Sequence, residues 1–415
     1  MTQNEQSQFS RRQFVKTAAA AAAATSAFPY IVGAAETNKP MRIGVIGFGG
    51  RGRGAVYNGF HANPNLRLVA FADLYADKAA ESLEKVKEVA EVEEKHQFVG
   101  VDGYKKLLEL DLDYVILATP PYYRPEHFEA CVEAGKNVFM EKPVAVDPVG
   151  ARRIMAAGEK AKAKGLSVVA GTQRRHDALY NAVIKRIHDG EIGDVVSGSC
   201  YWNSSQLWYK PRQEGWSEDE WMHRDWVNWA WLSGDHIVEQ HVHNIDVMNW
   251  VLGTHPEKVV SMGGRARRVT GNQFDHFASE FFYPGEVRVL SQCRQVNGCV
   301  NNVSEFVRGT KGYSYPRDFL STTGKLKIEK ISPYVQEHKD LIAAIQSGKP
   351  INEAQNVAES TLSGIMARTS AYTGKEVTWD EMMKSDLELK RPTYKLTPEN
   401  IKADIPVPGT VDRKR

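Results

Sequence analysis

The chain has 415 residues, a length that exceeds one ordinary domain and predicts two or three folded units. Its formal net charge is +2, with 42% hydrophobic and 25% charged residues. The sequence contains no run of about 18 apolar residues, the length that a helix needs to cross a bilayer. It also contains no Lys/Arg block of the kind that lines a nucleic-acid groove. We therefore expect a soluble protein body with no nucleic-acid partner and no membrane insertion.

The first 35 residues have the layout of a twin-arginine export signal. Arg11 and Arg12 precede an alanine run at 18–24, and a stretch of small residues ends near Ala35. A terminal Ala-rich helix, the alternative, would gain nothing from two adjacent arginines before a weakly apolar segment. We expect removal of this signal and a periplasmic or otherwise exported protein. Because this route carries folded proteins, a cofactor can be loaded before transport.

The cysteines are too few for a disulfide framework in so long a chain. They are Cys131, Cys200, Cys293 and Cys299, and no two have the CxxC spacing. We expect buried free thiols, with a Cys293–Cys299 bridge as the alternative in an oxidising compartment.

A glycine-rich turn follows the first predicted strand. Residues 42–46 have the pattern of a buried parallel strand, and a GxGxxG sequence runs from Gly47 to Gly52. Gly47 permits the tight turn, Gly49 lets a pyrophosphate approach the backbone, and Gly52 lets the next helix lie close to the strand. We expect a dinucleotide to bind at Gly47, Phe48, Gly49, Gly50, Arg51 and Gly52.

A second predicted strand, at 66–72, ends at Asp73, which lies 21 residues after Gly52. A carboxylate at this place accepts hydrogen bonds from the adenosine 2′-hydroxyl and would repel the 2′-phosphate of NADP. Asp73 therefore favours NAD as the cofactor. The alternative is a surface aspartate that caps the next turn.

Predicted strands and helices then alternate up to residue 170, which indicates βαβ units and a doubly wound parallel sheet. The strands are expected at 114–118, 137–140 and 167–170, and the helices at 104–110, 126–134 and 148–164. Ligands bind such sheets at the carboxyl ends of the strands. Two of these strands lead into the remaining residues that we expect at the cofactor: Thr119, Pro120, Glu141 and Lys142.

The order of these motifs resembles the Gfo/Idh/MocA oxidoreductase family. The motifs are the glycine turn, Asp73, Ala118-Thr119-Pro120-Pro121, Glu141-Lys142-Pro143, and a His-x-x-Asp segment from His243 to Asp246. The resemblance implies an α/β protein with an N-terminal Rossmann domain, at 40–170, and a C-terminal α/β domain, at 171–390, followed by a tail at 391–415. The second domain would hold a large, mostly antiparallel sheet, which often forms the oligomer interface. A carbohydrate substrate and a homodimer or homotetramer are also implied.

The resemblance also implies catalytic positions. In the family, the motif lysine and a histidine on the first helix of the second domain face the nicotinamide, and an acidic residue usually precedes that histidine by four. Here these positions are Lys142, His243 and Glu239, with glutamate in place of the usual aspartate. The longer side chain could move the acid toward a substrate hydroxyl or away from the histidine. Residues 233–250 predict one helix, on which Glu239 and His243 share a face because they are four apart.

Oxidation of a secondary alcohol needs a base for the hydroxyl proton while a hydride leaves the carbon, and imidazole suits this task near neutral pH. His243 is the candidate base. Lys142 would stabilise negative charge on the same oxygen, or act as the base if burial beside NAD+ favours its neutral form. A core histidine is the alternative for His243. The nearby His236 and His241 invite a metal site, but without a second ligand cluster we expect no metal.

Seven of the nine tryptophans lie between Tyr201 and Trp231. Aromatic faces stack on the C–H surfaces of sugar rings, and a long connection between a strand and a helix is more often functional than structural. We expect about half of these rings to pack in the core or an interface. Trp202, Trp208 and Tyr209 are expected nearest the substrate, because they follow a strand predicted at 195–201.

Arg174 and His176 follow the strand that ends at Ala170, and we expect both to donate hydrogen bonds to substrate hydroxyls. In the Gfo/Idh/MocA family, which this sequence resembles, the equivalent stretch often contacts substrate or cofactor. The remaining predicted elements would build the second sheet and then return to cover the nucleotide domain. They are strands at 259–265, 279–283, 287–294 and 325–331 and helices at 334–347 and 352–373, before a Pro-rich tail.

An exported protein meets little free NAD, so we expect a tightly held cofactor that a second sugar-like or redox substrate resets. The leading hypothesis is an NAD-dependent oxidoreductase acting on a secondary alcohol of a sugar, polyol or glycoside. The alternative is a glycoside hydrolase that works by transient oxidation at C3, elimination and addition of water. A sugar-binding protein without turnover would predict loss of Lys142 or His243, and both are present.

Overall fold

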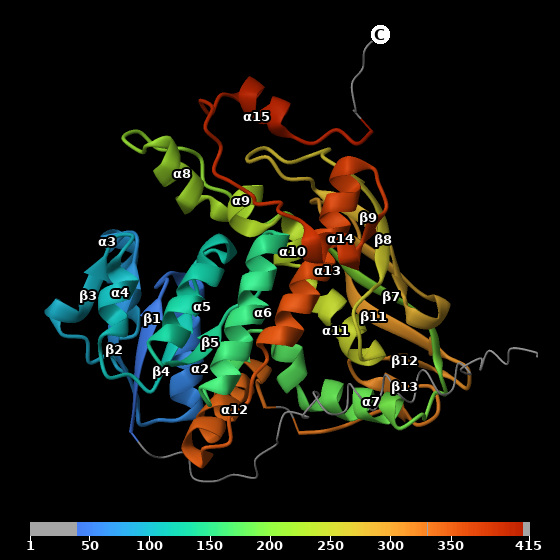
Figure 1. Ribbon diagram of the computed structural model, residues 1–415, viewed down its shortest axis with the longest axis horizontal. Coiled ribbons are helices and arrows are strands. Elements are labelled where there is room, and N and C mark those ends of the chain that lie inside the picture. The colour runs from blue at the N-terminus through green and yellow to red at the C-terminus, as the bar shows by residue number, and fades with distance from the viewer. Residues whose placement is uncertain (1–39, 330, 410–415) are drawn as a thin grey trace, which may run out of the picture.

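The computed structural model describes residues 40–329 and 331–409, so the expected export signal lies outside the described residues. Two sheets stand on either side of a layer of helices (Figure 1). Throughout the described part of the chain, no helix combines the length and the apolar character needed to cross a membrane.

The first sheet has six parallel strands in the order β3-β2-β1-β4-β5-β6, which confirms the predicted doubly wound sheet. Its strands are β1 (Met41–Ile46), β2 (Leu66–Asp73), β3 (Gln97–Val99), β4 (Tyr114–Leu117), β5 (Asn137–Met140) and β6 (Val168–Ala170). The central strands are buried almost throughout, as expected where helices cover both faces of a parallel sheet. The strand order reverses between β1 and β4, and a ligand crevice is expected at such a point.

Helices from both ends of the chain cover this sheet. They are α2 (Gly50–Ala62), α3 (Ala76–Lys85), α4 (Gly103–Leu108), α5 (Arg124–Glu133) and α6 (Pro148–Ala163), with α12 (Pro333–Ser347) and α13 (Ala354–Thr373) from the C-terminal half. α12 packs on α2, and α13 packs on α6, as the predicted return to the nucleotide domain requires.

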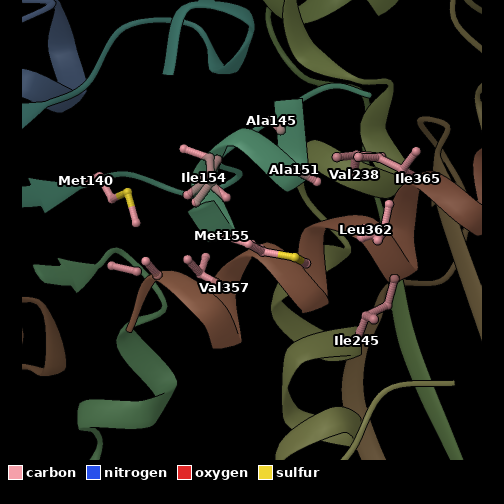
Figure 2. Packing of buried hydrophobic residues seen from close by; sticks show 14 of the residues in the cluster. Met140, Ala145, Ala151, Ile154, Met155, Val238, Ile245, Val357, Leu362 and Ile365 are labelled. Carbon is pink, nitrogen blue, oxygen red and sulfur yellow. The ribbon is translucent and has the colours of Figure 1, made fainter. Parts of the chain in front are cut away.

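The hydrophobic core is continuous between the two sheets. In Figure 2, Ile154 and Met155 of α6 lie near Val357 and Leu362 of α13, and the same cluster continues to Ile245 in the second half of the chain. Burial of large apolar side chains contributes about 1.5–3 kcal/mol each. This shared core fixes the two sheets relative to each other, and therefore fixes any site formed between them.

The second sheet has nine strands in the order β14-β13-β12-β11-β7-β10-β9-β8-β15. Among the strands that the structure describes in this sheet, only β7 and β10 pair in parallel, so the expected mostly antiparallel sheet is confirmed. The strands are β7 (Val195–Ser204), β8 (Lys258–Gly264), β9 (His276–Tyr283), β10 (Val287–Gln295), β11 (Asn302–Gly309), β12 (Tyr313–Tyr315), β13 (Phe319–Leu320), β14 (Gly324–Lys325) and β15 (Val377–Thr378).

Two strand predictions for this sheet need correction. The prediction of a strand at 325–331 is wrong. Gly324–Lys325 forms the short strand β14, and residues 326–329 form no strand. β11 was not predicted, since its sequence places Glu305 among apolar residues. In the fold, Arg174 and Tyr180 pair with that carboxylate inside the protein and make its burial possible.

The helix expected across residues 233–250 is broken. α10 (His236–Glu239) ends before Gln240, and α11 (Val242–Leu252) begins after His241. The His241 ring turns toward the second sheet, where its Nε2 lies 2.7 Å from Ser291 Oγ and 3.8 Å from Cys200 Sγ. The break frees the C-terminal carbonyl groups of α10 for other partners.

The tryptophan-rich segment and the C-terminal tail pack together. The segment contains α8 (Glu218–Arg224) and α9 (Ala230–Ser233), and the tail contains α15 (Pro398–Asp404); all three lie at the same end of the molecule (Figure 1). Trp229 and Trp231 form a third hydrophobic cluster with Leu396 of the tail. Packing therefore accounts for part of the tryptophan content, as expected.

All four cysteines are free, so the alternative bridge between Cys293 and Cys299 is not formed. Three of the thiols are buried, as expected, but Cys299 is exposed, because it lies in the connection after β10.

Candidate functional site

The glycine turn between β1 and α2 has the backbone that the sequence pattern requires. Gly47 has a φ of 88°, and a Cβ there would lie 2.5 Å from the backbone nitrogen of Thr119. Nothing lies within 4 Å of a Cβ built on Gly49 or Gly50. The turn is therefore closed on the side of β4 and open where a ligand would approach.

The start of α2 suits an anion. Gly49, the N-cap, gives no side-chain hydrogen bond, and the first turn carries no acidic residue. Free amide groups and the helix dipole attract a phosphate at such an end.

Asp73 joins the end of β2 to this turn. Its carboxylate accepts hydrogen bonds from the backbone nitrogens of Phe48, at 2.7 Å, and Tyr75, at 3.0 Å. Burial raises the pKa of Asp73, while these hydrogen bonds act in the opposite direction. This carboxylate fits the ribose of NAD, and the open turn with the uncapped helix fits its pyrophosphate.

Lys142 and Glu239 meet between the two domains. Lys142 follows β5, and its Nζ lies 3.1 Å from Oε1 of Glu239 at the end of α10. The same ammonium group donates a hydrogen bond of 2.5 Å to the backbone oxygen of Glu239, one of the carbonyls that the helix break frees. Both side chains are nearly buried, with 11% and 9% of their surface exposed. The pair is thus a shielded cation with a fixed position.

His243 lies in the first turn of α11 and stacks on Trp202 of β7, with ring centroids 5.6 Å apart and ring planes at 23°. Burial lowers the pKa of His243 well below 6.5, and the charges of Lys142, Arg174 and Arg51 lower it further. His243 is therefore a neutral imidazole beside several cations, the form in which it can accept a proton. Because the Lys142 charge is among the causes of this lower pKa, the two predicted catalytic residues lie near each other.

Arg174 borders Trp202 on another side. Its guanidinium lies 5.8 Å from the Trp202 ring centroid, and it pairs with Glu305 at 2.5 Å. Tyr180 and Asn244 also donate to the Glu305 carboxylate. The structure thus brings Arg174 and Trp202 to His243, as expected. Sequence reasoning missed Glu305, Tyr180 and Asn244. β11 was not predicted, Tyr180 belongs to no motif, and Asn244 occupies an unspecified position of the His-x-x-Asp segment.

Arg51 and Glu141, both expected at the cofactor, pair with each other. Arg51 also lies 3.3 Å from Glu337 of α12, and its guanidinium is 5.3 Å from the ring centroid of Tyr334. These contacts connect the glycine turn, the Glu-Lys-Pro motif and α12. Thr119 and Pro120 come shortly after the end of β4, and Thr119 lies beside Gly47 at the same edge of the sheet.

The other predicted substrate residues are His176, Trp208 and Tyr209. His176 is buried between Asp340, 2.6 Å from its Nδ1, and Glu353, 3.2 Å from its Nε2. Although burial alone would lower it, these carboxylates raise the pKa of His176 to about 10. Trp208 and Tyr209 are about half exposed, and Trp208 packs edge-on against Trp226. Their substrate contacts stay predictions.

The three clustered histidines turn to different partners. His236 lies 3.1 Å from Asp235, His241 is bonded to Ser291, and His243 stacks on Trp202. They do not converge as the metal hypothesis would require.

The parallel nucleotide-binding sheet carries a lysine at its carboxyl edge, and an adjoining antiparallel-sheet domain contributes a histidine. This arrangement defines a two-domain fold of the dehydrogenase class. The chain belongs to the GFO/IDH/MocA family. Residues 41–170 match the model of the oxidoreductase family with an NAD-binding Rossmann fold, and residues 180–314 match the GFO/IDH/MocA C-terminal domain. NAD is accordingly the cofactor of the first domain.

Known proteins resemble the chain over different lengths. An inositol 2-dehydrogenase of Klebsiella pneumoniae is 27% identical over 212 residues, which are 51% of this chain and 54% of that protein. The chain thus spans about half the length of such relatives. A glycosyl hydrolase family 109 protein of Streptomyces coelicolor is 28% identical over 159 residues, 38% of this chain and 33% of the relative. The structure of GenD2 from gentamicin A biosynthesis, in complex with NAD, has a TM-score of 0.65 at 18% identity and covers 83% of this chain and 97% of its own. This likeness shows the fold.

Proposed function

We propose that the protein is an NAD-dependent oxidoreductase that removes a hydride from a secondary alcohol of a sugar, polyol or glycoside. The observation that carries the proposal is the neutral His243 beside the fixed Lys142 at the carboxyl edge of the Rossmann sheet. The Klebsiella relative, named an inositol dehydrogenase, supports a polyhydroxylated substrate.

In this mechanism His243 accepts the hydroxyl proton and Lys142 stabilises the negative charge that develops on the same oxygen. Glu239 keeps Lys142 in position through its carboxylate and its backbone oxygen. When bound, NAD supplies the hydride acceptor. Trp202 keeps the imidazole plane fixed, and Arg174, whose guanidinium lies beside Trp202, donates hydrogen bonds to other hydroxyls of the substrate.

We also propose that the protein works outside the cytoplasm with a tightly held cofactor that a second sugar-like or redox substrate resets. The twin arginines at 11 and 12 support export, and the scarcity of free NAD there makes retention necessary.

A homo-oligomer formed through the second sheet is part of the same proposal. α11 and α13 cover one face of this sheet. On its strands Met262 is 71% exposed and Leu290 43% exposed, a degree of apolar exposure that a partner subunit would cover. Light scattering on the eluted peak of a sizing column would test it, and a monomer at micromolar concentration would contradict it.

A glycoside hydrolase is the second candidate, because the Streptomyces relative carries that name. In such a reaction, oxidation at C3 acidifies the neighbouring C–H, elimination releases the aglycone, water adds, and the hydride returns to C3. The same base and the same lysine would serve, so product analysis has to separate the two functions.

The test uses purified holoprotein with a panel of polyols, sugars and aryl glycosides. A keto product with reduction of the bound nucleotide supports the oxidoreductase. Release of aglycone without net redox change supports the hydrolase. If the protein contains NAD and yields neither product with any member of the panel, both assignments fail.

A further inference from the structure

Helix α8 of the tryptophan-rich segment contacts the nucleotide domain at two places. Arg224 forms a double ion pair with Asp77, with Nη1 and Nη2 at 2.9 and 3.0 Å from the carboxylate oxygens. The preceding residue, His223, lies 2.6 Å from the hydroxyl of Tyr123, and the two rings are stacked. Two neighbouring residues of one helix thus hold two separate parts of the Rossmann domain.

These contacts lie on opposite sides of β1. Asp77 follows the end of β2, and Tyr123 follows the end of β4, while the sheet order is β2-β1-β4. Adjacent strands are about 4.8 Å apart, so one helix that reaches both ends crosses roughly 10 Å. β1, between them, leads into the glycine turn. α8 therefore crosses the carboxyl end of β1, and Figure 1 shows it at that edge of the domain.

The adenosine side of the turn is enclosed by the same helix. Tyr75 stands two residues after Asp73, and the Arg224 guanidinium lies 4.4 Å from its ring centroid. Trp216 also stacks against Arg224, with its ring centroid 5.0 Å from the Arg224 guanidinium carbon. Burial and the carboxylates of Asp219 and Glu220 raise the pKa of Tyr75 to about 12, as expected for a phenol covered by α8.

The segment that carries α8 is fixed rather than loosely attached. The Trp221 indole donates to the backbone oxygen of Lys210 at 2.8 Å, and Asp225 accepts from the Lys210 nitrogen at 2.8 Å. The C-terminal tail holds the outer side, where Arg391 pairs with Asp219 at 2.7 Å.

We propose that residues 205–229 form a strap that closes over the NAD, tied down by Arg224 on one side of the glycine turn and by His223 on the other. This inference rests on the proposed function, in which the cofactor is retained between turnovers. The nucleotide can leave only when the strap lifts from the β2 or the β4 side, so its release is slow.

The experiment measures release of NADH from the loaded holoprotein after addition of excess NAD+, by the loss of nicotinamide fluorescence. Arg224→Gln removes both the ion pair and the cover over Tyr75, and Asp77→Asn removes only the ion pair. Arg153→Gln is the matched control, because Arg153 makes a similar double ion pair with Glu129, between α6 and α5.

We expect slow release from the wild type and from Arg153→Gln, and release about tenfold faster from Arg224→Gln, which corresponds to about 1.4 kcal/mol. Asp77→Asn, a change of an exposed side chain that should fold normally, is expected to give a smaller acceleration. Rates within about twofold of wild type in both strap variants would overturn the proposal, as would equal acceleration in Arg153→Gln. Since no alcohol substrate is present, a wrong substrate assignment cannot produce either result.

Discussion

Lys142 is held by Glu239 through two different groups, the carboxylate at 3.1 Å from Nζ and the backbone oxygen at 2.5 Å. The second bond exists because α10 ends at Glu239 instead of continuing into α11. The position of the ammonium group therefore depends on the backbone as well as on the acid side chain.

This double attachment predicts unequal effects of two substitutions. Lys142→Met removes the group that stabilises the developing charge, and we expect kcat to fall by about 10²- to 10⁴-fold. Glu239→Gln leaves the hydrogen bond from Lys142 to the backbone oxygen in place, so we expect kcat to fall only about tenfold. Steady-state rates of substrate oxidation would measure both, with Lys160→Met, at an exposed ion pair, as the control. Equal losses in the two variants would contradict the role of the backbone oxygen.

The depressed pKa of His243 predicts an unusual pH dependence. Because burial keeps the imidazole neutral well below pH 6.5, kcat/KM of the wild type should stay level as the pH falls through 6.5 and decline only at more acidic values. His243→Asn should lower kcat/KM by on the order of 10²-fold and abolish the acidic decline that reports this group. An acidic limb with its midpoint near 6.5 would show that the base is a more solvated group.

The glycine turn predicts a difference between two small substitutions. Gly49→Ala places a methyl group in open space, so the protein should fold normally but bind NAD at least about tenfold more weakly, since the methyl group occupies the path of the pyrophosphate. Gly47→Ala forces a φ of 88° on alanine and a clash with Thr119, so it should also lower the melting temperature. Thermal melts and nucleotide titrations of both variants would check this.

His176 is predicted to stabilise the fold in a pH-dependent way. The pKa of His176, about 10, is raised above the ordinary value near 6.5. The stabilisation that its positive charge gives the fold is therefore fully present below pH 6.5 and is lost as the pH rises through 10. His176→Gln should lower the melting temperature by about 5 °C or more at pH 6, because it leaves Asp340 and Glu353 without their buried cation.

The deficit of His176→Gln should shrink toward pH 10. The exposed His61 provides the control, and His61→Gln should melt like the wild type. A deficit that is the same at pH 6 and pH 10 would rule out this charge as its cause.

Local sequence patterns were sufficient to predict the fold of the nucleotide domain. The order of strand, glycine turn and helix, the acid at the end of the second strand and the Glu-Lys-Pro segment each depend on neighbouring residues, and the structure places all of them at one edge of the sheet. The helix break at Gln240 and His241 could not be predicted locally, because no glycine or proline lies there. It comes with the bond from His241 to Ser291, fifty residues away.

Other features depend on pairings that no local pattern contains. Glu305 is buried because Arg174 and Tyr180 reach it from another part of the chain. The contact of Arg224 with Asp77 joins residues 147 positions apart, so the tryptophan content indicated a functional segment without indicating where it would lie. His176 follows a strand end as expected, but two carboxylates from α12 and the start of α13 occupy its ring nitrogens.

Isotope labelling can show whether the protein transfers a hydride directly from the substrate carbon to NAD. Holoprotein containing NAD+ would be mixed with a polyol or sugar deuterated at its secondary alcohol carbons, and the nucleotide would then be extracted and analysed by mass spectrometry. We predict rapid appearance of deuterium in the reduced nucleotide of the wild type, and its appearance about 10²- to 10⁴-fold more slowly in Lys142→Met. Turnover of the labelled substrate with no deuterium ever reaching the nucleotide would show that the protein is not a hydride-transferring dehydrogenase.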